Sequence, residues 1–516
     1  MSFDLAIVGG GIVGAGVARD AARRGLKTAL FEQQDFAGGT TAASTRLVHG
    51  GLRYLASGDF RLVRLDLRER ETLLRIAPHL VRPLPFLLPL PRHRGVERLK
   101  LRLGMYLYDA LSFDKSLPKH RVLTDATLRR LEPGLDATQF AGAALFHDAQ
   151  VYSPERLTIE NLTDAVAHGA AVVNYAEVVA PMTTGNRIVG LKITDRLTGQ
   201  DFEVRARIIV NASGPWLDRA GSRLAANQQR LLRTTKGVHV ACERFTDQAI
   251  ALESAIDGRL VFAIPWAGYT WVGTTDTDYM GPPESATATA ADVTYLVDSL
   301  APHLPAIRRA RRYWTCAGVR ALVDSTRSPS GVTRMHRIVR DDAGLISIVG
   351  GKITGYRAIA EQVTDIVCAQ LGVPRTASTT ASPLPGAADG FEADGMLERT
   401  YGARATLVRG LVDSDPTLGT CLMPGRPEIA AEVVFSTRHE WCVHLDDFML
   451  RRSYLGFAPD RGLQAAGAVS RWMQRELRWS DEERHRQLHT YETRARRDLL
   501  EWTEQDAATA VPTHAR

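Results

Sequence analysis

The N-terminal residues 1–32 combine two apolar runs with an intervening helical spacing of apolar positions. Residues 5–8 form the first run, residues 12–22 place Ile, Val and Ala at helical intervals, and residues 28–31 form the second run. Short apolar runs bounded by turns indicate buried strands, and a repeat of three to four residues indicates a helix. The pattern therefore predicts a strand–helix–strand unit.

The rest of the chain divides into regions of different periodicity. Helical spacing is present at 59–76 and 155–167, and the prolines between 83 and 91 are expected to interrupt regular structure. The β-rich segments predict a strand (171–179), a hairpin (187–194 and 201–207), a buried strand (207–211), a separate antiparallel sheet (238–242, 260–265 and 270–273) and a strand (345–349) followed by a helix ending near Leu371. Residues 376–390 have the composition of a linker, and 391–510 are mostly helical in pattern.

A glycine motif lies between the first predicted strand and helix. Gly9, Gly11 and Gly14 form GxGxxG, and Glu32 ends the second strand. The first glycine permits a tight turn, the second lets the backbone approach a pyrophosphate, and the third allows close helix–strand packing. The phosphates would lie at the helix N-terminus. Glu32 would accept hydrogen bonds from ribose hydroxyls and repel a 2′-phosphate, which favours FAD or NAD over NADP.

Composition narrows the class of protein without deciding its partner. A chain of 516 residues predicts two or three domains, and 45% hydrophobic with 24% charged residues is typical of a soluble globular protein. The net charge of +6 suits an anionic substrate, an anionic membrane or nucleic acid. Five cysteines without a CxxC pair indicate a reduced intracellular protein with no cysteine-based metal site. No signal peptide or membrane-spanning run is evident, so any membrane contact is expected to be peripheral.

Later glycine turns favour FAD over NAD. The chain has one GxGxxG motif, and two further glycine turns, at 211–214 and 349–354, each follow an apolar strand. A large extended cofactor needs several strand ends that open onto one groove. In residues 40–55, Gly50 and Gly51 would let the backbone approach a planar ring, next to the polar side chains of His49, Arg53 and Tyr54.

The segment 46–55, RLVHGGLRYL, resembles the aerobic FAD-dependent glycerol-3-phosphate dehydrogenases of the D-amino-acid-oxidase-like flavoprotein superfamily. Further sequence motifs of this family match residues 4–16, 211–216, 236–239, 264–266, 272–276, 317–320, 332–334, 350–354 and 439–441. Two positions depart from the family. Ala42 replaces a usual hydroxyl, so one cofactor hydrogen bond is expected to be missing, and Gly355 replaces a common threonine at a helix start, which costs up to ~1 kcal/mol relative to alanine.

The resemblance implies an α/β plus α fold with a Rossmann-type FAD-binding domain, an antiparallel-sheet substrate domain and a helical C-terminal cap. The expected FAD-binding domain is discontinuous (1–90, 150–235 and 330–375), the substrate domain comprises 91–149 and 236–329, the linker 376–390, and the helical domain 391–516. The residues expected to bind FAD are Gly9, Gly11, Gly14, Glu32, Thr40, Thr41, Ser44, Thr45, Val178, Ala212, Gly214, Gly350, Gly351 and Thr354.

The expected catalytic residues are His49, Arg53, Tyr54, Arg320, Arg334 and Lys352. Glycerol 3-phosphate carries nearly two negative charges, and arginines suit such a dianion because they bind it bidentately. His49 is the first candidate for the base that takes the hydroxyl proton, and His239 is a second. Lys352 would stabilise the negative charge of a reduced flavin.

The resemblance implies FAD-dependent oxidation of sn-glycerol 3-phosphate to dihydroxyacetone phosphate, with hydride transfer to flavin N5 and electrons passed to a membrane quinone. It places the protein in the cytoplasm, on the inner face of the cytoplasmic membrane. The basic, partly amphipathic segment 92–107 could supply that contact or could be a solvated helix packed on its own domain. The sequence is also compatible with a homodimer.

Three alternatives stay open at this point. An oxidase that passes electrons to oxygen shares the same motifs. An RNA-modifying flavoprotein would need a basic patch interleaved with aromatic residues, but the basic residues are scattered among acids, so no nucleic-acid partner is expected. A non-catalytic flavin-binding scaffold would leave the arginine set unexplained.

Overall fold

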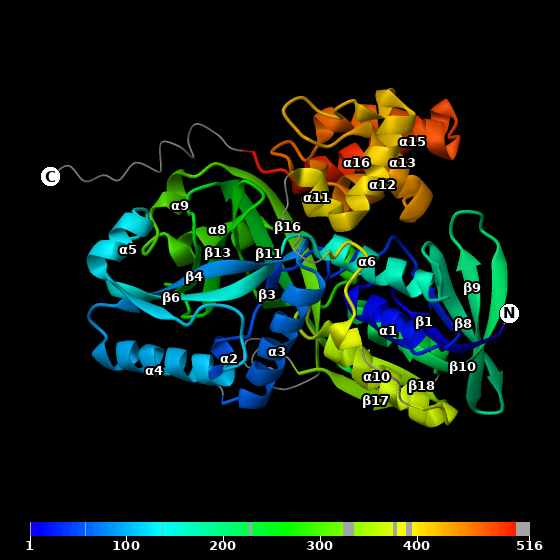
Figure 1. Ribbon diagram of the computed structural model, residues 1–516, viewed down its shortest axis with the longest axis horizontal. Helices are drawn as coiled ribbons and strands as arrows, with labels where there is room; N and C mark the ends of the chain where they lie inside the picture. Colours follow the sequence, from blue (N-terminus) through cyan, green and yellow to red (C-terminus); the bar gives the residue numbers. More distant parts are fainter. Residues whose placement is uncertain are drawn as a thin grey trace.

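The computed structural model describes residues 2–56, 58–136, 138–225, 230–323, 335–374, 379–388 and 395–501. Figure 1 shows two sheet-containing regions side by side, with a group of helices from the C-terminal part of the chain above them. Together they confirm the predicted α/β plus α fold class.

The first sheet has a parallel centre. Its order is β17-β18-β10-β1-β2-β7, and the β8–β9 hairpin extends from β10. Strands β7, β2, β1, β10 and β18 run parallel. The strands are β1 (Ser2–Val8), β2 (Thr28–Phe31), β7 (Ala171–Val173), β8 (Ala176–Thr184), β9 (Arg187–Asp195), β10 (Asp201–Asn211), β17 (Arg337–Arg340) and β18 (Leu345–Val349).

Both faces of this sheet are covered. Leu5 and Ile7 of β1 belong to the same core as α1 (Ile12–Arg23), α6 (Pro154–Ala167) and α10 (Tyr356–Leu371), whereas Ala6 and Val8 pack with residues of β8 and β9. A strand buried on both faces needs a continuous apolar sequence, which is why the apolar runs predicted the strands correctly. The predicted strand 171–179 is in fact two strands, because the chain turns at Tyr175, whose φ is +54°. β7 pairs with β2, and β8 pairs with β9.

The second sheet is largely antiparallel. Its order is β15-β11-β14-β13-β12-β4-β6-β3, with β16 beside β11 and β5 beside β6. Its strands are β3 (Leu47–Val48), β4 (Val81–Pro91), β5 (Arg121–Thr124), β6 (Phe140–Val151), β11 (Leu232–Glu243), β12 (Ala249–Glu253), β13 (Leu260–Trp266), β14 (Tyr269–Gly273), β15 (Thr277–Asp278) and β16 (Arg312–Val323). The predicted antiparallel pairing of β11, β13 and β14 is confirmed.

The expectation that prolines interrupt residues 83–91 is wrong. These residues lie in β4, which pairs with β6 along most of its length and with β12 at Phe86 and Leu87. Successive backbone N–H groups point to opposite edges of a strand. The four prolines, at 83, 85, 89 and 91, all occupy odd positions, so the donors that they lack belong to one edge only. The strand therefore keeps the hydrogen bonds of its other edge.

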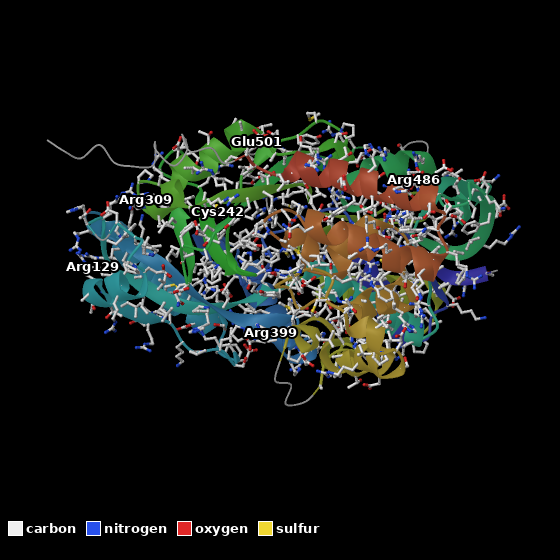
Figure 2. All side chains as sticks on the ribbon, turned by 90° about the horizontal axis from the view of Figure 1, so that it is seen from above. Arg129, Cys242, Arg309, Arg399, Arg486 and Glu501 are labelled. Atoms are coloured by element: carbon white, nitrogen blue, oxygen red, sulfur yellow. The ribbon has the colours of Figure 1, made fainter. Side chains whose placement is uncertain are left out.

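Of the remaining helices, α7 (Leu217–Leu224) packs against β8, β10 and β18 of the first sheet, and the others lie near the second sheet or form the C-terminal region. Those before residue 310 are α2 (Arg53–Ala56), α3 (Phe60–Ile76), α4 (Gly95–Leu111), α5 (Asp125–Leu131), α8 (Ala290–Leu300) and α9 (Ala306–Arg309). The C-terminal helices are α11 (Met396–Tyr401), α12 (Ala405–Ser414), α13 (Ala430–His439), α14 (Leu445–Asp447), α15 (Leu463–Leu477) and α16 (Asp481–Asp498), which share a core of their own. Seen from above, Arg129 lies at the left and Arg486 at the upper right of the molecule (Figure 2), and Cys242 is buried. Within the described ranges, no helix is long and apolar enough to cross a membrane.

Candidate active site

A cavity of about 1510 Å³ connects the two sheets. It starts at the carboxyl ends of β1, β2, β10 and β18 and continues to residues of β11, β13 and β16. Ligands of open parallel sheets bind at the carboxyl ends of the strands. Typical ligand pockets measure about 300–1000 Å³, so this cavity has room for a dinucleotide together with a small substrate.

The glycine turn after β1 has the contacts that a phosphate-binding turn requires. Gly9 has φ +109°, and a Cβ there would lie 2.8 Å from the Ala212 carbonyl oxygen. A Cβ on Gly14 would lie 2.0 Å from the Gly9 carbonyl oxygen, although Gly14 itself does not line the cavity. Gly14 thus lets α1 pack against the turn, and Gly9 and Gly11 face the cavity.

Glu32 ends β2 at the same edge of the sheet. Its carboxylate accepts hydrogen bonds from the Gly10 N–H at 2.7 Å and the Gln34 N–H at 2.9 Å. Burial raises the pKa of Glu32, and the two backbone donors oppose that change. A carboxylate has about four lone-pair directions, so Glu32 can bind ribose hydroxyls while it holds this turn.

The Ser/Thr loop, residues 40–46, is held by Arg46, which is not among the predicted site residues. Arg46 is buried and binds Glu155 through both terminal nitrogens, at 2.7 and 3.0 Å. Its guanidinium lies 4.3 Å from the Trp266 ring centroid and donates to the Ala42 carbonyl oxygen at 3.3 Å. Position 42, where the family hydroxyl is missing, is therefore fixed through its backbone.

Two loops meet beside His49. The His49 N–H donates to Thr354 Oγ1 at 3.2 Å, and the Gly51 N–H donates to His49 Nδ1 at 3.0 Å. A neutral imidazole whose Nδ1 accepts a hydrogen bond carries its proton on Nε2. In this arrangement His49 offers a proton at Nε2.

Lys352 is paired with a buried carboxylate. Its Nζ forms an ion pair with Asp66 of α3 and lies 4.4 Å from the Tyr54 ring centroid. Burial raises the pKa of Asp66 to about 6, and Lys352 opposes the shift. Asp66 is separated from Lys352 by 286 positions and lies in an amphipathic, charge-rich helix, so no local signal distinguished it from surface acids.

Arg320 of β16 and His239 of β11 line the cavity from the second sheet. The Arg320 guanidinium donates to Asp276 at 2.9 Å, to the Thr275 carbonyl oxygen at 3.1 Å and to Thr274 Oγ1 at 2.7 Å. His239 is buried, and its Nε2 lies 3.0 Å from Thr45 Oγ1. Burial, followed by the charge of Arg320, holds the pKa of His239 well below its ordinary value.

Most of the expected site residues share this cavity. Its lining includes Gly9, Gly11, Glu32, Thr40, Thr41, Ser44, Thr45, His49, Tyr54, Val178, Ala212, Gly214, Arg320, Gly350, Gly351, Lys352 and Thr354. Arg334 and the side chain of Arg53 lie outside the described residues. In the part of the chain that the structure describes, no group of three or more His, Cys, Asp or Glu side chains is arranged to hold a metal ion.

A family model described as FAD dependent oxidoreductase matches residues 4–360, which carry both sheets and the cavity. The chain belongs to the FAD-dependent oxidoreductase family. The glycine turn after β1, the Glu32 carboxylate and the volume of the cavity fit FAD, the cofactor of this family. A second model, described as the C-terminal domain of alpha-glycerophosphate oxidase, matches residues 377–484 of this oxidoreductase.

Individual relatives of this FAD-dependent oxidoreductase cover almost its whole length. A glycerol-3-phosphate dehydrogenase from Synechocystis is 36% identical over 95% of this chain and 96% of its own. The crystal structure of the glycerol-3-phosphate dehydrogenase from Bacillus halodurans, complexed with FAD, matches with a TM-score of 0.80 at 30% identity, over 96% of this chain and 95% of that one. Glycine oxidase from Geobacillus kaustophilus, 20% identical with a TM-score of 0.55 over 75% of this chain and 99% of its own, shares the fold.

Proposed function

We propose that this FAD-dependent oxidoreductase oxidises sn-glycerol 3-phosphate to dihydroxyacetone phosphate. The observation that carries the proposal is the 36% identity to a glycerol-3-phosphate dehydrogenase across 95% of the chain. The cavity adds independent chemical support, because Arg320, Lys352, His49 and His239 line it together with the loops that fit FAD. When bound, FAD supplies the acceptor for the hydride that leaves C2 of the substrate.

Arg320 binds the phosphate in this proposal. Its guanidinium is fixed by Asp276 and Thr274, so it meets an anion in one orientation and loses little conformational freedom on binding. Arg53 and Arg334 are proposed as further phosphate ligands from the family resemblance. Lys352 adds a cation at the end of β18, where it stabilises negative charge that develops on the cofactor.

The proton of the C2 hydroxyl passes to a histidine. His49 was the first candidate from the sequence, but its Nδ1 already accepts the Gly51 N–H, so the neutral ring has no lone pair at Nε2. Burial holds the pKa of His239 below its ordinary value, and Thr45, which contacts its Nε2, lines the cavity. A phosphate on Arg320 offsets one of the charges that lower the His239 pKa. On this basis we propose His239, reached directly or through Thr45, as the proton acceptor.

Anaerobic reduction of the flavin tests the substrate. The purified holoenzyme is titrated with sn-glycerol 3-phosphate in the absence of oxygen, with glycerol and sn-glycerol 1-phosphate as controls. We expect only the sn-3-phosphate to bleach the flavin absorbance at substrate concentrations that saturate the site. A flavin that stays oxidised with the sn-3-phosphate overturns the proposed function.

The electron acceptor is proposed to be a membrane quinone. Reoxidation of the substrate-reduced enzyme by a soluble quinone analogue is compared with reoxidation by oxygen, each mixed rapidly with the same anaerobic sample. Faster reoxidation by the quinone analogue supports a dehydrogenase. Faster reoxidation by oxygen identifies the alternative, an oxidase that releases hydrogen peroxide.

Helix α4 is proposed to bind the inner face of the cytoplasmic membrane. Leu99 and Leu103 are 58% and 59% exposed, and Val96, Tyr106 and Leu107 are also exposed. The same helix carries Arg98, Lys100 and Arg102, a combination typical of helices that lie in an anionic membrane surface. Lys100 and Leu101 also line the cavity, so this surface borders the proposed active site.

Vesicle flotation tests this surface. The double variant Leu99→Glu/Leu103→Glu is compared with Leu407→Glu, which alters a leucine of similar exposure (57%) in α12. We expect the α4 variant to lose binding to vesicles that contain anionic lipid and the α12 variant to keep it. Equal binding by both variants excludes α4 as the contact.

A further inference from the structure

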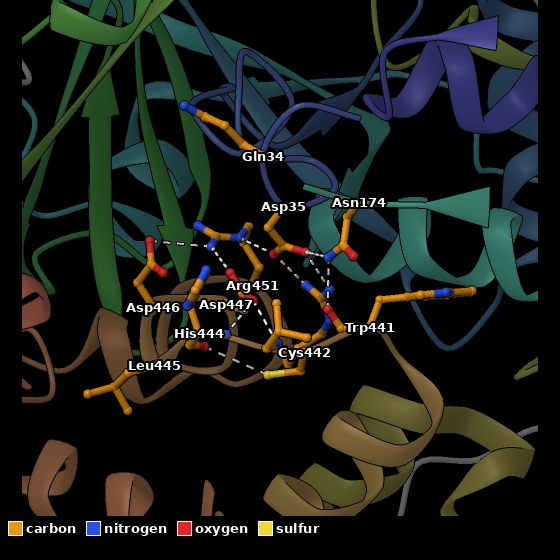
Figure 3. A network of polar contacts seen from close by, with 12 residues as sticks. Gln34, Asp35, Asn174, Trp441, Cys442, His444, Leu445, Asp446, Asp447 and Arg451 are labelled. Carbon is orange, nitrogen blue, oxygen red and sulfur yellow. Dashed lines mark hydrogen bonds and ion pairs between the residues drawn. The ribbon is translucent and has the colours of Figure 1, made fainter. Parts of the chain in front are cut away.

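The loop that follows β2 has cavity-facing ends and an anchored centre. Residues 32–34 and 38–41 line the cavity next to the glycine turn, but residues 35–37 do not. Figure 3 shows the Gln34 side chain directed away from the Asp35 carboxylate, which faces Arg451. The contacts of the central residues therefore determine where the cavity-facing ends lie.

Asp35 is anchored by the C-terminal helical region. It is 2% exposed, and its carboxylate accepts hydrogen bonds from Arg452 at 2.7 and 2.9 Å and a further hydrogen bond from Arg451 Nε. Both arginines belong to a π-helical turn, Phe448–Arg452, a rare conformation that places two consecutive guanidinium groups on one carboxylate. Burial alone would raise the pKa of Asp35, but Arg452 and Arg451 hold it below its ordinary value.

The arginine pair is itself fixed by other groups. Arg452 donates to the Glu440 carbonyl oxygen at 2.8 Å, and Arg451 donates to Asp447 at 2.7 Å. Asp447 also accepts the Tyr175 hydroxyl hydrogen bond at 2.6 Å, and Asn174 donates to Asp35 at 3.2 Å. The further charged groups that face this network are Asp446, His444 and Arg494.

Phe36 makes a second connection between the loop and the C-terminal helical region. A Cβ on Gly10 would lie 2.5 Å from the Phe36 ring, so this ring packs directly on the glycine turn. On its other side the ring contacts Trp441 edge-on, with centroids 5.5 Å apart. The next residue, Ala37, donates its N–H to the Gly10 carbonyl oxygen at 3.0 Å.

We propose that the C-terminal helical region holds the loop and the glycine turn that bind the adenosine diphosphate end of FAD. The positioning residues are Asp35, Arg451 and Arg452, together with Trp441, which packs on Phe36. The inference depends on FAD binding and is independent of the proposed substrate. It assigns the C-terminal region, which matches its own family model over residues 377–484, a role in retaining the cofactor.

A second buried ion-pair group provides a matched control. Arg404 of the C-terminal region contacts Glu160 of α6 and Glu440, each at 3.2 Å, and is 9% exposed. This group joins the same two parts of the chain, but neither Arg404 nor Glu160 touches the loop or lines the cavity. Removal of the Arg404 guanidinium therefore weakens the docking of the helical region without a direct effect on residues 33–37.

The experiment measures FAD release from the holoenzyme. Asp35→Asn and Arg404→Gln are diluted in series, free FAD is followed by its fluorescence, and unfolding temperatures are recorded for both. We expect Asp35→Asn to raise the FAD Kd at least tenfold, which is about 1.4 kcal/mol, and Arg404→Gln to raise it less than threefold at a comparable loss of thermal stability. An unchanged Kd in Asp35→Asn, or an equal rise in both variants, overturns the proposal.

If Asp35→Asn does not fold, a milder variant at Trp441 still tests whether the C-terminal region contributes to FAD affinity. Trp441→Leu removes the ring that contacts Phe36 and leaves every charge in place. We expect it to raise the FAD Kd at least threefold, whereas Trp441→Phe, which retains an aromatic ring, restores most of the affinity. Equal Kd values for Trp441→Leu and the parent enzyme contradict the proposed role.

Discussion

Gly237→Ala tests the assignment of Arg320 to the substrate without altering a charged residue. A Cβ at position 237 would lie 2.2 Å from Arg320 Nη2, whereas ordinary contacts begin near 3.4 Å, so the guanidinium must move by about 1.2 Å. That movement breaks the hydrogen bonds to Thr274 at 2.7 Å and Asp276 at 2.9 Å. A charge-assisted hydrogen bond contributes about 1.5–3 kcal/mol, so a guanidinium that no longer reaches the substrate phosphate lowers kcat/KM about 10- to 150-fold.

Steady-state kinetics with glycerol 3-phosphate, together with the FAD Kd, checks this prediction. Gly318→Ala is the matched control, because Gly318 pairs directly with Gly237 across β11 and β16, but its Cβ would lie 2.4 Å from Ala43 of the Ser/Thr loop. We expect Gly237→Ala to raise KM with little change in FAD affinity, and Gly318→Ala to weaken FAD binding. An unchanged kcat/KM in fully loaded Gly237→Ala would refute the role of Arg320.

The remaining predictions concern protonation and buried charge. The folded-state pKa of Asp66 is raised from 3.8 to about 6, so the parent protein should lose about 3 kcal/mol of unfolding free energy as pH rises from about 4 to 6. This group should cause no further change above that range. Urea unfolding of Asp66→Asn should lack the loss, and an identical pH slope in both proteins would contradict the pKa shift. His239→Asn should lower kcat about 10²- to 10⁴-fold, whereas His49→Asn should have a smaller effect; the reverse order in pre-steady-state flavin reduction identifies His49 as the base. Arg156 opposes the effect of burial and holds the pKa of Glu440 at about 2 in the folded state. Denaturant unfolding at pH 7 should therefore show that Glu440→Gln costs about 3–5 kcal/mol, and this difference should shrink as pH falls from about 4.5 toward 2. Equal stability of both proteins at pH 7 would contradict the ion pair.

Local patterns predicted the strands and the glycine turn at one end of the cavity correctly. The apolar runs of β1 and β2 are continuous because these strands are buried on both faces, and Gly9 and Gly14 between them face backbone atoms that leave no space for a side chain. Both features act over a few residues, so a single sequence contains them. The parallel part of β10, which precedes Ala212, was predicted as the buried strand 207–211 by the same reasoning.

Charged residues that meet over long sequence distances could not be predicted. Asp66 and Arg70 lie in a helix whose charged positions resemble a solvated face, yet both are fully buried and bind Lys352 and Asp148, respectively. Asp35 and Arg452 are 417 positions apart. Buried charges require partners, and only the fold brings those partners together. The prolines of β4 misled the prediction for a related reason, because a proline is tolerated or disruptive according to which edge of a strand it faces.

Rapid anaerobic mixing of the holoenzyme with sn-glycerol 3-phosphate that carries deuterium or hydrogen at C2 tests whether the enzyme oxidises this substrate at C2. We expect the protiated substrate to bleach the flavin absorbance within a single turnover, and deuterium at C2 to slow this bleaching, because the C2–H bond breaks as the flavin is reduced. A flavin that remains oxidised, or bleaching that deuterium at C2 leaves unchanged while deuterium at another carbon slows it, would contradict the proposed oxidation of glycerol 3-phosphate at C2.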